Sequence, residues 1–137
     1  MPEDAMKVRQ DVFVTEQGFY DEFDDVDAVA VHLVLYDNNG CPIGTCRVFE
    51  NGTPGSFTLG RLAVMKDYRG KHLGAYILSA AEEHIRSLSG REIILHAQCQ
   101  AEQFYYKSGY LPFGDIEDEQ GCPHIWMRKT LSGGVNK

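Results

Sequence analysis

One stretch, residues 59–88, constrains the fold more than any other part of the chain, and it reads LGRLAVMKDYRGKHLGAYILSAAEEHIRSL. It opens with a short apolar run, 59–65, whose length suits a buried strand. It closes with residues at the three-and-four spacing of an amphipathic helix: Leu73, Ile77, Ala80, Ala81, His84, Ile85 and Leu88. Between them lies a basic turn with two glycines, Gly70 and Gly74. The stretch therefore predicts a strand, a tight turn and a helix in succession.

This turn has the features of an anion-binding site. Backbone N–H groups at a helix start have no intrahelical partner, and the helix dipole adds partial positive charge there. Glycine lets the backbone approach a phosphate closely. Two common phosphate-binding loops are excluded, because neither GxxxxGK[ST] nor GxGxxG occurs in the chain. The sequence therefore predicts a phosphate-binding turn of another type.

The bulk properties limit the class of protein. A chain of 137 residues is expected to form one domain, 1–137, with an ordered core at about 6–131. The net charge of −7 argues against a nucleic-acid binder and permits a cationic substrate, although a solvated acidic surface is the favoured explanation of it. No run approaches the roughly 18 apolar residues of a membrane span, and no signal-peptide pattern opens the chain. We therefore expect a cytoplasmic protein.

The cysteines give little support to a metal centre. Cys41, Cys46, Cys99 and Cys122 form no CxxC pair, so no metal is predicted. Reduced thiols fit best, with a disulfide between Cys41 and Cys46 left open.

The remaining chain alternates helices and strands. We expect helices at 6–17, ended by Gly18, and at 101–107, ended by Gly109. The acidic segment 19–27 is expected to be a loop lining a site, because like charges at that density disfavour packing. Strands are expected at 28–37, 43–50, 57–65, 92–98, 110–116 and 124–130, with an acidic turn at 117–123 and a disordered tail at 132–137. The strands at 57–65 and 92–98 flank a crossover helix and should be parallel.

The loop 69–74, RGKHLG, resembles the Q/R-x-x-G-x-G/A pyrophosphate loop of the GNAT superfamily of acyl-CoA-dependent N-acyltransferases. Four further segments resemble its ElaA/YjcF-like branch, in the correct order: 9–17, 44–47, 104–110 and 121–125. The resemblance implies an α/β (α+β) GNAT fold, in which a mostly antiparallel mixed sheet contains a central parallel splayed pair flanked by helices. His72 departs from the pattern, since a glycine is usual there. The family's first strand also has only five residues available before Met6.

The resemblance further implies acetyl-CoA as the cosubstrate. Its pyrophosphate would bind the loop residues, and its pantetheine arm would pair with the backbone of the preceding strand. The residues assigned to it in this way are Leu62, Ala63, Val64, Arg69, Gly70, Lys71, His72, Leu73, Gly74, Ala75, Gln98 and Tyr105.

The catalytic groups follow from the same resemblance. Tyr105 occupies the general-acid position, and its phenol would protonate the leaving thiolate, although it could merely pack against the cofactor. Tyr106 is the weaker candidate. The general base is open among four residues, with the first two ranked higher: Glu16, His124, His32 and His96.

We therefore expect an N-acetyltransferase that moves an acetyl group from acetyl-CoA to a primary amine by direct attack in a ternary complex. The acidic segment 19–27 suggests a cationic acceptor. Two alternatives remain: a CoA-binding sensor or interaction module without turnover, and a structural domain whose turn binds nothing. Strand edges in such folds can pair, so a homodimer stays open.

Overall fold

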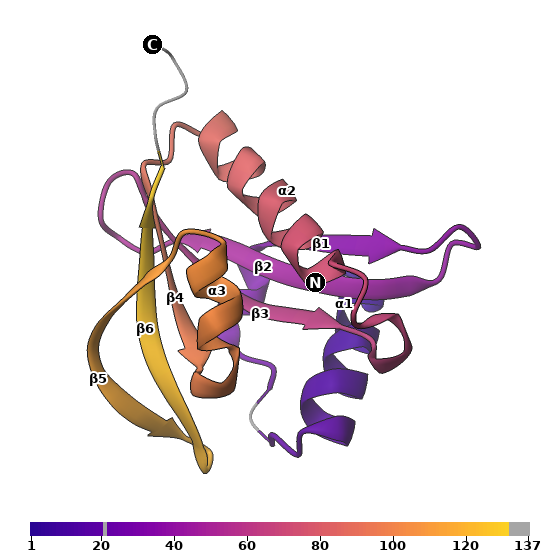
Figure 1. The fold of residues 1–137 in the computed structure, drawn as a ribbon. Helices are drawn as coiled ribbons and strands as arrows, with labels where there is room; N and C mark the ends of the chain where they lie inside the picture. Colours follow the sequence, from indigo (N-terminus) through magenta and orange to yellow (C-terminus); the bar gives the residue numbers. More distant parts are fainter. Residues whose placement is uncertain (21, 132–137) are drawn as a thin grey trace. The chain divides into compact units, whose positions relative to one another are not determined.

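The computed structural model describes residues 1–20 and 22–131, so the predicted tail at 132–137 lies outside the described residues. The sheet has six strands in the order β1-β2-β3-β4-β6-β5 and is flanked by helices, which confirms the predicted mixed α/β fold (Figure 1). The chain divides into two compact units. Unit 1 contains Met1–Phe49 and Leu59–Glu83, and unit 2 contains Glu50–Thr58 and His84–Lys137.

The elements follow one another in the predicted order, and no strand precedes the first helix in the described chain. Their bounds are α1 (Glu3–Arg9), η1 (Gln10–Glu16), η2 (Asp25–Ala28), β1 (Val31–Tyr36), β2 (Pro42–Glu50), β3 (Ser56–Val64), η3 (Lys66–Tyr68), α2 (Leu73–Ser87), β4 (Glu92–Gln98), η4 (Cys99–Ala101), α3 (Glu102–Lys107), β5 (Leu111–Glu119) and β6 (Cys122–Thr130). No helix in the described part is long and apolar enough to cross a membrane.

The first helix differs from the prediction in its winding. It starts at Glu3 and changes after Arg9 into a π-helix, in which Gln17 N–H donates to Val12 at 3.0 Å. The wider turn rotates the buried stripe, which consists of Val8, Val12 and Phe13 packed on Ala63. Met6, Gln10 and Gln17 lie outside this stripe and are exposed. Gly18, at φ 80°, ends the helix as predicted.

The strands β1 and β2 form a hairpin at the positions predicted for the first two strands. The strands are antiparallel, from Val31↔Val48 to Tyr36↔Pro42. Gly44 lies where a Cβ atom would be 2.5 Å from Ile77 Cδ1 of α2, so glycine allows β2 and α2 to approach closely at this point.

Unit 2 contains the predicted parallel pair. Ser56, Phe57 and Thr58 of β3 pair in parallel with Glu92, Ile93 and Ile94 of β4. β6 is antiparallel to both β4 and β5. The expected acidic turn at 117–123 is wrong, because β5 continues to Glu119 and the turn is confined to Gln120 and Gly121, both with positive φ. The charged side chains of this edge strand face solvent, where they do not oppose strand formation.

Candidate active site

The predicted strand–turn–helix geometry is present in unit 1. Gly70 and His72 both adopt left-handed backbone, with φ of 82° and 61°. Tyr76 N–H donates to His72 O at 3.1 Å, so the helix begins directly after His72. The N–H groups of Leu73, Gly74 and Ala75 in its first turn therefore have no carbonyl partner within the helix. A Cβ atom on Gly70 would meet nothing within 4 Å, so the turn is open at this point.

Arg69 fixes the start of this turn. Its Nε donates to Val64 O at the end of β3 at 3.0 Å. Its two terminal nitrogens donate to Glu16 at 2.6 and 2.7 Å. The hydrogen bond with Arg69 and the charge of its guanidinium lower the pKa of Glu16. This lowered pKa makes Glu16 a weaker proton acceptor than an ordinary carboxylate.

The end of β3 holds the three residues assigned to the pantetheine arm. Ala63 is buried, and Leu62 and Val64 are half-buried. The preceding residue, Arg61, has a φ of 55° inside the strand, which is rare for a residue other than glycine. This irregularity was not predicted, although Gly60 within a strand pattern is a signal for it.

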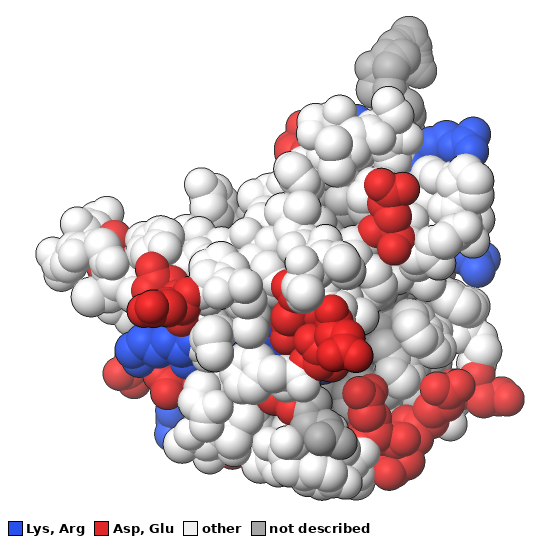
Figure 2. Space-filling view, turned by 180° about the vertical axis from the view of Figure 1, so that it is seen from behind, with Lys and Arg blue, Asp and Glu red and all other residues white. Residues whose placement is uncertain are grey.

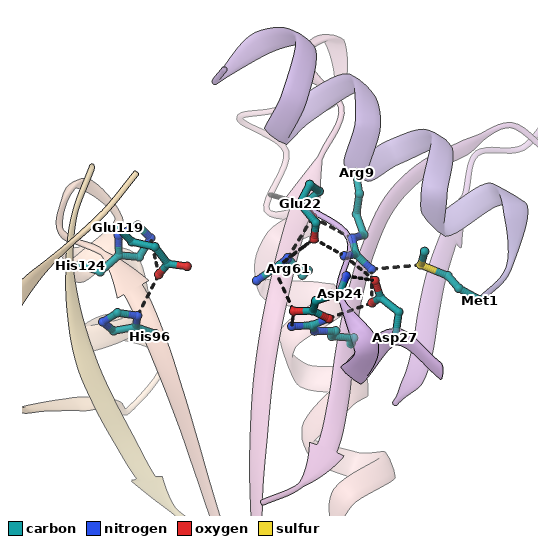
Figure 3. Close-up of polar contacts among 10 residues, drawn as sticks. Met1, Arg9, Glu22, Asp24, Asp27, Arg61, His96, Glu119 and His124 are labelled. Atoms are coloured by element: carbon teal, nitrogen blue, oxygen red, sulfur yellow. Dashed lines mark hydrogen bonds and ion pairs between the residues drawn. The ribbon is translucent and has the colours of Figure 1, made fainter. Parts of the chain in front are cut away.

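An ion-pair cluster connects the first helix, the acidic segment and the strands of unit 1 (Figure 3). We define the arginine cluster as Arg9, Glu22, Asp24, Asp27, Arg47 and Arg61. Arg9 is 1% exposed and binds Glu22 at 2.8 Å and Asp27 at 2.6 Å. Arg47 binds Asp27 at 2.8 Å and Asp24 at 2.6 Å. The expected unpacked loop is therefore wrong for the described residues 22–27, and Asp21 lies outside the description.

The charges of the arginine cluster compensate each other. Burial alone would raise the pKa of Asp27, but hydrogen bonds from Arg9 and Arg47 hold it well below its usual value. Burial raises the pKa of Glu22, and the neighbouring arginines oppose this shift. Paired carboxylates of this kind are not available to a cationic substrate. The acidic segment therefore no longer supports a cationic acceptor.

Unit 2 contains the candidate general acid. Tyr105 is 8% exposed and lies on α3, with its ring at 5.0 Å from Phe104 and 5.9 Å from Tyr110 in edge-on contacts. Tyr106, the weaker candidate, is 55% exposed.

Two of the four candidate bases lie together in unit 2. The rings of His96 and His124 are 5.0 Å apart, and Glu119 lies beside both (Figure 3). His96 Nδ1 is 3.1 Å and His124 Nε2 is 3.9 Å from Glu119 Oε2. Glu119 was not predicted, because the sequence placed it in a turn. His32 lies in unit 1, where its Nε2–H donates to Asp27 O at 3.0 Å.

One further cofactor assignment concerns a side chain rather than the backbone. Gln98, assigned to the cofactor, accepts a hydrogen bond from Gln100 at 2.8 Å.

Cys46 is fully buried, and burial raises the pKa of its thiol to about 12, which makes it unreactive as a nucleophile. All four cysteines are free thiols. The described residues contain no group of three or more ligands that could hold a metal ion.

The family model of the acetyltransferase (GNAT) domain matches residues 2–131. The chain is 35% identical to the uncharacterized N-acetyltransferase YjcF of Bacillus subtilis over 129 residues, covering 92% of this chain and 90% of YjcF. Among solved structures, an acyl-CoA N-acyltransferase from Pseudomonas aeruginosa superposes with a TM-score of 0.83 at 27% identity, covering 92% of this chain and 87% of that one. Escherichia coli ElaA gives a TM-score of 0.82 at 25% identity, with the same coverages.

The chain therefore belongs to the GNAT acetyltransferase family. It lies near the ElaA/YjcF-like branch and is an acyltransferase.

Proposed function

We propose that this protein transfers an acetyl group from acetyl-CoA to a primary amine of a small molecule or peptide, by direct attack in a ternary complex. The observation that carries the proposal is the turn at 69–75, where Arg69 is anchored and the first N–H groups of α2 follow an open glycine. The proposal takes 1–137 as a single catalytic domain, which the family match over residues 2–131 supports.

The turn fits a pyrophosphate on physical grounds. A helix start offers N–H donors and partial positive charge to an anion, and α2 has 15 residues to contribute to its dipole. We assign the pyrophosphate to the backbone of residues 70–75 and the pantetheine arm to the backbone at Leu62, Ala63 and Val64. Since Val64 O already accepts from Arg69, the contribution of Val64 would come from its N–H.

The chemistry requires two proton transfers. The amine loses a proton as its nitrogen attacks the thioester carbonyl, and the thiolate that leaves gains one. We propose Tyr105 as the donor to the thiolate, because a phenol with a reference pKa of about 10 still carries its proton at neutral pH and can donate it. No cysteine in the described chain has the setting of a nucleophile, and this favours direct attack over an acyl-enzyme. The four free thiols fit a reaction in the cytoplasm.

A second candidate is a CoA-binding sensor without turnover. It is favoured by His72, a side chain in left-handed conformation where the family has glycine. The two candidates differ in the rate of acetyl transfer and agree in cofactor binding.

The test is calorimetric titration of acetyl-CoA into the wild-type protein and into Gly74→Trp, which blocks the turn. Ser79→Trp is the matched control, since it places the same ring on an exposed position of the same helix. We expect micromolar binding that Gly74→Trp abolishes and Ser79→Trp retains. Binding then justifies a screen of amines with thiol-release detection. A wild-type protein that does not bind acetyl-CoA overturns both candidates.

A further inference from the structure

A cluster of titratable side chains lies on one face of three strands in unit 2. Residues at alternate positions of a strand share a face, which places Glu117 with Glu119 on β5 and His124 with Trp126 on β6. His96 of β4 pairs with Trp126 in the strand register and stacks on its ring at 4.6 Å. The opposite face of β4 carries buried core residues, whereas His96 is only half-buried. The cluster therefore occupies the less buried face of the sheet.

The hydrogen-bond partners define where each imidazole carries its proton. His124 Nδ1 lies 2.8 Å from the carbonyl of Cys122, which can only accept, so this nitrogen bears the hydrogen. His96 Nδ1 lies 3.1 Å from the carboxylate of Glu119, so this nitrogen bears the hydrogen as well. Each ring consequently has its lone pair on Nε2.

The lone pair of His96 is the free acceptor of the cluster. Its Nε2 is buried and makes no hydrogen bond in the described chain. The nearest carboxylate oxygen is Glu117 Oε1 at 3.4 Å, from a side chain that is 58% exposed. A proton on His96 would thus face one carboxylate from each nitrogen. Glu117 is the member that a molecule arriving from solvent meets first.

The negative charge on the surface of β5 is consistent with Glu117 being the first residue that a cationic molecule contacts. Acidic side chains gather at the place of β5, at the lower right of Figure 2, where Asp115, Glu117 and Asp118 are exposed. An ammonium group is attracted to such a strand. The exposed carboxylates of β5 alone would only keep this edge strand soluble. The buried Nε2 atom of His96, next to Glu117, adds a group that can accept a proton.

We propose that Glu117, His96 and Glu119 form a proton relay that deprotonates the acceptor ammonium, an inference that rests on the proposed acetyl transfer. Glu117 contacts the ammonium and passes its proton to His96 Nε2, which leaves the neutral amine to form the new C–N bond. Glu119 is a positioning residue that accepts from His96 Nδ1 and stabilises the imidazolium. After turnover, His96 passes this proton back to Glu117, which releases it to solvent. The C–S bond breaks in the same reaction, and its thiolate is protonated separately.

The relay is tested by steady-state acetyl transfer with Glu117→Gln, His96→Gln and Glu119→Gln. Glu50→Gln is the control, because it removes one exposed carboxylate of unit 2 that lies outside the acidic strand. We expect kcat/KM to fall about 100-fold for Glu117→Gln and His96→Gln and about tenfold for Glu119→Gln. The control should stay within twofold. Acetyl-CoA affinity should be unchanged in all four.

A second measurement does not depend on turnover. Multiple-bond ¹H–¹⁵N NMR spectra of the wild-type protein should show the Nδ1–H tautomer for His96, and Glu119→Gln should weaken this preference. Glu117→Gln alters an exposed side chain, so its kinetics remain informative if His96→Gln fails to fold.

The outcomes separate the two proposals. Wild-type transfer that Glu117→Gln and His96→Gln leave within threefold overturns the relay alone, as does an Nε2–H tautomer of His96. A wild-type protein that binds acetyl-CoA but acetylates no amine overturns the proposed function, and the relay with it.

Discussion

Arg69 and Glu16, separated by 53 positions in the sequence, form a bidentate ion pair with N–O distances of 2.6 and 2.7 Å. This pair joins the end of the first helix to the turn that opens α2. It favours an anchoring role for Glu16 over that of a general base, since the guanidinium lowers the pKa of this carboxylate and makes it a weaker proton acceptor.

Glu16→Ala and Glu16→Gln distinguish these two roles. If Glu16 anchors Arg69, Gln keeps one acceptor oxygen, so we expect acetyl-CoA affinity to fall several-fold in the Ala variant and to recover partly in the Gln variant. Thermal stability should change by less than about 1 kcal/mol, because both side chains are substantially exposed. Calorimetry and thermal melts measure both quantities. Equal loss of kcat in the two variants at unchanged affinity would instead identify Glu16 as the base.

His72→Gly tests the strained turn. A residue with a Cβ pays roughly 1 kcal/mol in the left-handed region, so we expect stabilisation of up to about 1 kcal/mol and no loss of acetyl-CoA affinity. Gly70→Ala is the matched opposite, since it adds a Cβ at φ 82° where space is open, and should destabilise by about 1 kcal/mol. Urea denaturation checks both. Destabilisation by His72→Gly would show that the imidazole holds the turn.

Arg47→Met tests the energetic importance of the arginine cluster. Removing one partner leaves buried Asp27 short of a hydrogen-bond donor, so we expect a loss of about 3 kcal/mol in the free energy of unfolding. Lys7→Met removes an exposed ion pair with Asp11 and should cost about 0.5 kcal/mol or less. Similar effects of the two substitutions in chemical denaturation would contradict a structural role of the cluster.

The pH dependence of stability follows from the lowered pKa of Asp27. In the unfolded chain this carboxyl titrates near the ordinary aspartate pKa of 3.8, while in the folded protein its lowered pKa keeps it ionised at lower pH. Its contribution is therefore present above about pH 5 and is lost as pH falls towards about 2. The raised pKa of Glu22 acts in the opposite direction. We expect Asp27→Asn to show a shallower decline over this window in denaturation at stepwise pH.

Tyr105→Phe tests the general acid. The buried ring keeps its contacts with Phe104 and Tyr110, so we expect the fold to be retained while kcat falls at least tenfold. Tyr106→Phe on the exposed neighbouring position serves as the control and should leave kcat unchanged. If the hydroxyl of Tyr105 only supports packing, Tyr105→Phe will lower the free energy of unfolding and leave kcat equal to that of the wild type.

The fold follows from the sequence where the signals are local. The periodic apolar positions between Leu73 and Leu88 predicted α2 to within one residue, and the parallel pairing of β3 and β4 followed from the helix between them. The turn between β3 and α2 could be predicted for the same reason, since strand, glycine and helix are consecutive in the sequence.

The remaining features depend on contacts between distant side chains. Asp27 pairs with Arg9 and Arg47, which lie 18 and 20 positions away, so an acidic run expected to repel itself is instead packed. The π-helix at Gln10–Glu16 has no local signature. Glu119 contacts His96 because the turn between β5 and β6 is confined to Gln120 and Gly121, which leaves Glu119 on the strand.

The buried Cys46 provides a natural probe of local opening in the folded protein. Because its thiol is fully enclosed and holds its proton, a thiol-modifying reagent can reach it only when β2 detaches from its neighbours. Cys41, Cys99 and Cys122 are more accessible and react without such an opening. The rate of modification at Cys46 therefore measures how often this part of unit 1 opens under native conditions.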